Sequence, residues 1–129
     1  MSRFLGPSAL RSKFRNAPRP AWKVADSFRQ WLRGRPCACG GRNPDCDGPI
    51  RSAHVDYAAK GTSDAKGTAS KVADRWCIPL SDGCHKLQHT IGWPAFDRKY
   101  LPAKAEVLAA AYWQAWPSRH QWERDLANV

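Results

Sequence analysis

The sequence lacks any long run of apolar residues. No segment of the 129-residue chain approaches the roughly 20 consecutive apolar residues that a membrane-spanning helix needs. The amino terminus also lacks the continuous apolar stretch, between a basic start and a cleavage site, that marks a secretory signal peptide. These absences predict a soluble, cytoplasmic protein without a membrane partner.

Acidic residues are scarce relative to basic ones. The chain has 11 Asp and Glu against 21 Lys and Arg, which gives a formal net charge of +10. Such a balance implies an anionic partner, and nucleic acid is the leading candidate. A chain of this length forms one domain with a modest core, which favours a compact fold helped by a metal ion.

Cysteine is limited to five residues. An odd number in a reducing compartment excludes a disulfide framework and favours metal ligation. Cys37, Cys39 and Cys46 fall within a segment, 36–49, that is rich in Gly, Asn, Asp and Pro. This composition is typical of turns. We therefore predict a zinc knuckle in this segment.

Residues 1–25 contain no acidic residue and are interrupted by three prolines. This pattern predicts an extended basic arm that binds nucleic-acid phosphates and releases their counterions. A disordered, solubilising tail is the alternative. Residues 26–129 are expected to form a single domain.

Hydrophobic spacing and helix-breaking residues predict the elements of that domain. A helix over 26–33 is indicated by the Asp26 cap, a shared apolar face and a stop at Gly34. Segments 50–57 and 75–80 are rich in β-branched and aromatic residues, and we expect them to pair as antiparallel strands.

Three further helical segments follow the second strand. We predict a short helix over 83–92 that Trp93 caps, and a longer one over 102–116 with proline in its first turn. The expected apolar stripe of the longer helix consists of Val107, Leu108, Ala111 and Ala115. A last amphipathic segment ends near residue 127.

The sharpest local pattern is the pair His85 and His89. Residues four apart on a helix point the same way, so both imidazoles can reach one metal ion. A solvated helix face is the alternative explanation of this spacing. Upstream lie His54 in the first predicted strand, then a glycine-containing loop and the second strand.

This order of strand with histidine, loop, strand and helix with histidine resembles the HNH (ββα-metal) endonuclease family. Within that family it is similar to small phage-type nucleases that enhance recombination. The resemblance spans residues 36–96 and leaves the C-terminal helices, 102–127, outside. The matching residues are Ala53-His54-Val55, Gly67, Lys71, Asp74, Ile78-Pro79-Leu80, Cys84-His85 and His89.

The resemblance implies an α+β fold with a ββα-metal core, a zinc knuckle and flanking helices. It also implies hydrolysis of DNA phosphodiester bonds, with His54 as the general base. His85 and His89 would bind one divalent ion, which could be Mg²⁺, Mn²⁺, Ni²⁺ or Zn²⁺. A phage or prophage origin, and a recombination or packaging protein as a second partner, follow from the same resemblance.

The sequence departs from the family pattern at Ala53, where many members have a metal-binding Asp before the base. A third ligand then comes from elsewhere or is water, and His54 itself remains a candidate ligand. Asp74 lies near the position of the family's central Asn, which orients the base, so we favour a catalytic role for it. For Asp56 and Asp82 we favour turn or cap roles.

The predicted structural zinc site uses four thiolates, from Cys37, Cys39, Cys46 and Cys84. The family's usual knuckle has two Cys-x-x-Cys pairs, whereas here the first pair is Cys-x-Cys and the second would begin at Ser81. We assign Cys77 to the core, with replacement of Cys84 as the alternative.

DNA phosphates are expected to bind both the arm and the loop between the strands. The loop lysines could equally belong to a mobile, solvated segment. The predicted contacts are Arg11, Lys13, Arg15, Arg19, Lys60, Lys66 and Lys71. A zinc-stabilised DNA-binding module without catalysis is the main alternative, and an RNA nuclease with the same histidines is another.

Overall fold

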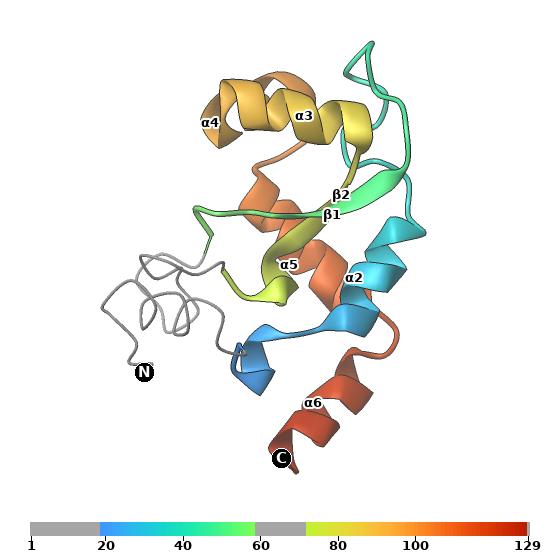
Figure 1. Ribbon diagram of the computed structural model, residues 1–129, viewed down its shortest axis with the longest axis vertical. Helices are drawn as coiled ribbons and strands as arrows, with labels where there is room; N and C mark the ends of the chain where they lie inside the picture. The colour runs from blue at the N-terminus through green and yellow to red at the C-terminus, as the bar shows by residue number, and fades with distance from the viewer. Residues whose placement is uncertain (1–18, 59–71, 129) are drawn as a thin grey trace, which may run out of the picture.

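The computed structural model describes residues 19–58 and 72–128, and its architecture is mixed α+β (Figure 1). No helix in these ranges has the length and apolar character to cross a membrane. In chain order, the described elements are η1 (Ala21–Lys23), α2 (Asp26–Arg33), β1 (Ile50–His54), η2 (Asp74–Trp76), β2 (Cys77–Ser81), α3 (Asp82–Ile91), α4 (Trp93–Tyr100), α5 (Ala105–Ala115) and α6 (Arg119–Ala127).

The two strands form an antiparallel pair, as the sequence predicted. The register places Ile50 opposite Ser81 and His54 opposite Cys77. Both strands are offset from their predicted bounds, since β1 ends at His54 and residues 74–76 form the short helix η2. His54 is therefore the last residue of β1, where its side chain can reach beyond the sheet.

Strand β2 leads directly into α3 without a loop. Ser81 ends the strand and caps the helix, because its Oγ accepts the backbone N–H of Cys84 at 3.1 Å. The predicted helix over 83–92 is thus confirmed with a shift of one residue. Gly92, at φ 84°, then separates α3 from α4, so Trp93 begins a new helix instead of capping the old one.

Helix α2 occupies the predicted span and buries Phe28 and Leu32. Its N-cap is Ala25 rather than Asp26, which is the first helical residue. The backbone N–H of Ala25 instead binds a buried carboxylate far along the chain, that of Asp74. The N-terminal end of α2 is consequently fixed by a tertiary contact and not by a local cap.

The prediction of which face of α5 is buried was wrong. The helix begins at Ala105, and its buried stripe is Ala105, Ala109 and Trp113, whereas Val107 is 56% exposed. Small alanines allow α5 to lie close against β2, and Trp113 packs edge-on against Phe28 of α2. Close packing of the helix on the sheet therefore buries the alanine face and not the face with larger aliphatic side chains.

Candidate metal and histidine sites

Four thiols converge beside the first turn of α3. The Sγ atoms of Cys37, Cys39, Cys46 and Cys84 all lie within 4.8 Å of one another. Four sulfurs around a tetrahedral zinc ion, with Zn–S bonds of about 2.3 Å, are separated by about 3.8 Å. All five cysteines are free of disulfides. This cluster could therefore hold a metal ion such as zinc, and Cys84 rather than Cys77 is its fourth member.

Hydrogen-bond donors surround the thiol cluster. The backbone N–H of Ser81 donates to Cys37 Sγ at 3.2 Å, and Asn43 Nδ2 donates to Cys84 Sγ at 3.3 Å. Donors of this kind stabilise thiolates and orient metal ligands. The contact between Asn43 and Cys84 could not be predicted from a local pattern, because the two residues are separated by 41 positions.

The thiols differ in how readily they ionise. Burial by itself raises the pKa of Cys39, but hydrogen bonds from the backbones of Asn43 and Gly41 outweigh it and bring the pKa to about 7. Burial raises the pKa of Cys84 to about 12. Because zinc binds thiolates, uptake of the ion by this cluster releases protons, and Cys39 ionises more readily than Cys84.

Gly83 fixes the knuckle against α3. Its backbone N–H donates to the carbonyl oxygen of Asp47 at 2.9 Å. A Cβ atom at this position would lie 2.3 Å from the carbonyl oxygen of Asp45. Only glycine permits this approach, so the thiol cluster and the helix that carries His85 are mechanically linked.

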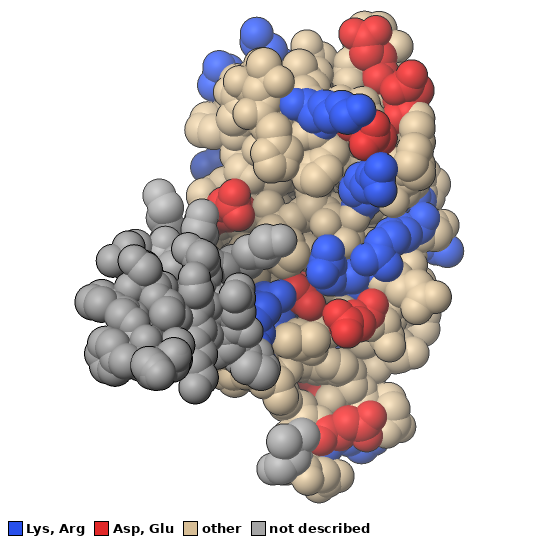
Figure 2. Space-filling view, viewed as in Figure 1, with Lys and Arg blue, Asp and Glu red and all other residues tan. Residues whose placement is uncertain are grey.

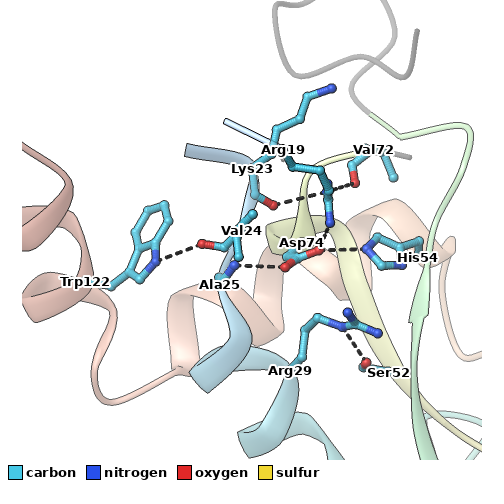
Figure 3. Close-up of polar contacts among 10 residues, drawn as sticks. All are labelled: Arg19, Lys23, Val24, Ala25, Arg29, Ser52, His54, Val72, Asp74 and Trp122. Atoms are coloured by element: carbon cyan, nitrogen blue, oxygen red, sulfur yellow. Dashed lines mark hydrogen bonds and ion pairs between the residues drawn. The ribbon is translucent and has the colours of Figure 1, made fainter. Parts of the chain in front are cut away.

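At the end of β1, the His54 side chain binds a buried carboxylate (Figure 3). Its Nε2 lies 2.8 Å from Oδ1 of Asp74, whose side chain is 1% exposed. The same oxygen accepts from Arg19 at 2.9 Å, and Oδ2 accepts from the backbone N–H of Ala25 at 2.8 Å. Both carboxylate oxygens of Asp74 thus accept hydrogen bonds.

The network keeps Asp74 ionised. Burial by itself raises the pKa of this carboxyl, but hydrogen bonds from His54, Ala25 and Arg19 outweigh burial and hold the pKa well below its usual range. An ionised carboxylate can only accept, so Nε2 of His54 carries the proton. In the neutral imidazole the lone pair would then lie on Nδ1, which has no hydrogen-bond partner within the described ranges.

Arg19, predicted to bind DNA, has its guanidinium engaged elsewhere. Besides Asp74, it donates to the carbonyl oxygens of Lys23 and Val72. No sequence signal could have indicated these contacts, because 55 positions separate Arg19 from Asp74. The other predicted DNA contacts lie outside the described residues: Arg11, Lys13, Arg15, Lys60, Lys66 and Lys71.

Cys77 adds a third potential ligand next to His54 and Asp74, within 4.8 Å of both. The guanidinium of Arg19 already supplies positive charge to the shared oxygen of Asp74. A metal ion bound to Asp74 would have to displace the guanidinium of Arg19. Cys77 is buried in the apolar cluster with Phe28 and Trp113. The arrangement therefore suits orientation of His54 better than metal binding.

His85 and His89 face each other on α3. Their Nε2 atoms are 3.2 Å apart. Two imidazole nitrogens bound to one ion at about 2.1 Å, with a bond angle of 90–110°, are separated by about 3.0–3.4 Å. Burial, then the positive charges of His89 and Arg51, lower the pKa of His85, which favours the neutral form that binds metals. The pair fits bidentate binding of a single ion.

No third protein ligand accompanies this pair in the part of the chain that the structure describes. Asp82 is engaged by Arg51 at 3.3 Å and by Lys86 at 2.9 Å. Asp56 instead lines a cavity of about 450 Å³ beyond the end of β1, together with Tyr57 and Asp97.

Comparison with known proteins finds no matching family model, no matching curated protein and no matching solved structure.

Proposed function

We propose that this chain is a metal-dependent endonuclease that hydrolyses DNA phosphodiester bonds. The observation that carries the proposal is the His54–Asp74 hydrogen bond at the end of β1. A histidine held by a buried carboxylate through one nitrogen, with the other nitrogen free, is the arrangement that a general base needs. The order of β1, β2 and α3, which resembles the HNH core, supports the same assignment.

In this proposal the general base lies on β1 and the metal ligands lie on α3. Nδ1 of His54 takes a proton from the attacking water, and the charge of Asp74 stabilises the imidazolium that results. His85 and His89, on α3, would hold a divalent ion, since their Nε2 atoms face each other at 3.2 Å. When bound, such an ion supplies stabilisation of negative charge on the phosphate and the leaving oxygen. The thiol cluster fixes the start of the same helix.

A second candidate is a zinc-stabilised DNA-binding module without catalysis. It is favoured by a specific observation, that His85 and His89 have no third protein ligand among the described residues. Ala53, in place of the acidic residue that the resemblance implies, points the same way. Both candidates share the thiol cluster and the basic surface, but the binding module would hold one tight zinc only and would not cleave DNA.

The test is a metal-dependence assay on the full chain. Weakly bound metals are removed by a chelator that leaves the tight zinc in place, and Mg²⁺, Mn²⁺, Ni²⁺ or Zn²⁺ is then added. Supercoiled plasmid and a matched RNA serve as substrates. We expect nicked plasmid with at least one ion. DNA binding without cleavage under all conditions would support the binding module, and cleavage of RNA alone would identify an RNA nuclease.

A further inference from the structure

Helix α2 presents Arg29 to the strand that ends in His54 (Figure 3). Nε of Arg29 donates to Oγ of Ser52 at 2.8 Å, and Ser52 is 7% exposed. Side chains two positions apart on a strand share one face. Ser52 therefore lies on the same face of β1 as His54, and the hydrogen bond fixes Arg29 beside the candidate base.

Among the residues that the structure describes, Arg29 is bound by a neutral partner. Some hydrogen-bonded arginines have a carboxylate partner, as in the pairs Arg19–Asp74, Arg51–Asp82 and Arg119–Glu123. Others, such as Arg42 and Arg124, donate to carbonyl or amide oxygens. Among the described residues, Arg29 has no ion pair, and its side chain is held only by a neutral hydroxyl.

One N–H of the guanidinium is used at Nε, and the four N–H groups on the two terminal nitrogens have no partner among the described residues. Arg29 is half-buried, with Phe28 beside it in the core. The anchored Nε restricts the rotation of the side chain. A planar guanidinium with both terminal nitrogens free matches two oxygens of one phosphate. Figure 2 shows Lys and Arg side chains gathered over the face that carries β1 and α2.

We propose that Arg29 is a phosphate-binding residue that takes two nonbridging oxygens of a DNA backbone phosphate adjacent to His54. The proposal rests on the proposed function, because the position of the candidate base defines which phosphate is meant. Ser52 acts as a positioning residue, since it reaches the phosphate only through Arg29.

The experiment measures DNA affinity by fluorescence anisotropy across a salt series. The full chain carries His54→Ala, so that the labelled duplex is not cut. Arg29→Gln is compared with Arg33→Gln, which removes the same charge one turn farther along α2. We expect Arg29→Gln to weaken binding about tenfold and to reduce the slope of log K against log salt by about 0.9. Arg33→Gln should leave the slope unchanged.

Two further variants separate charge from geometry. Arg29→Lys keeps the charge but loses the fork, and Ser52→Ala keeps Arg29 but removes its anchor. Both are expected to weaken binding by roughly threefold or more while the salt slope stays near that of the parent. Thermal melting and zinc content of each variant check the fold.

Equal losses in Arg29→Gln and Arg33→Gln would overturn the proposal, since they would indicate a general charge effect. An unchanged salt slope in Arg29→Gln would overturn it as well. These readings do not depend on turnover. A chain that never cuts DNA would refute the endonuclease proposal, whereas the anisotropy series would still decide whether Arg29 binds phosphate.

Discussion

At the residue scale, Asp74 determines how His54 can act. Asp74→Asn replaces an acceptor that binds both His54 and Arg19 with an amide that also donates. The preferred tautomer of His54 is then lost, and we expect the rate of DNA cleavage to fall by about 100-fold or more. Steady-state cleavage of a labelled duplex measures this. Asp56→Asn, on an exposed carboxylate two positions after His54, is the matched control. Equal effects of the two variants would contradict the assigned role.

Acid unfolding tests the same carboxyl by stability. The pKa of Asp74 is lowered in the folded chain, so its stabilisation is complete above the unfolded value of about 3.9 and is lost as the pH falls below it. The free energy of unfolding of wild type should therefore decrease more steeply below about pH 4 than that of Asp74→Asn. Urea titrations at several pH values, with zinc release followed in parallel, measure the difference. Parallel curves would contradict the network.

At the element scale, the junction between the knuckle and α3 depends on one glycine. Gly83→Ala places a methyl group against the backbone of Asp45, and we expect it to lower the free energy of unfolding by about 1–3 kcal/mol. Gly34→Ala is the control, because its Cβ would meet nothing closer than 3.4 Å and should change stability by less than about 0.5 kcal/mol. Denaturant titration compares the two. An unchanged free energy of unfolding in Gly83→Ala would contradict a close backbone contact at this junction.

The sequence predicted elements well where a local signal existed. Segments rich in β-branched and aromatic residues predicted the two strands, and the helix that follows β2 lies within one residue of its predicted bounds. The face of α5 was missed because hydrophobicity favours Val107 over Ala109, whereas close packing on β2 favours the smaller side chain. Periodicity alone does not report how near the neighbouring element lies.

The site was predictable only in part, for the same reason. His54, Asp74 and the thiols of the knuckle were identified from ordered short motifs. The partners that position them, such as Arg19 and Asn43, come from segments more than 40 positions away in the chain. A guanidinium or an amide at those positions has no local signature, since its role depends on tertiary contact alone.

At the scale of the whole molecule, metal content should separate into two classes. The thiol cluster is expected to bind one tight zinc per chain, and Cys39→Ser should lose it together with more than about 10 °C of thermal stability. His85→Ala should retain the tight zinc and lose a second, weaker ion. Metal analysis after gel filtration and isothermal titration measure both. A tight zinc that survives in Cys39→Ser would contradict the assigned ligands.

The most direct test of the proposed endonuclease, with His54 as its general base, is a plasmid cleavage assay. It compares wild type, His54→Ala and His120→Ala at matched zinc content with added divalent ion. His120 lies on α6 and is exposed, so its variant removes a histidine without touching the candidate site. We expect metal-dependent nicking by wild type and His120→Ala, and a rate at least about 100-fold lower for His54→Ala. Equal nicking by all three proteins, or none by wild type with any ion, would contradict the proposal.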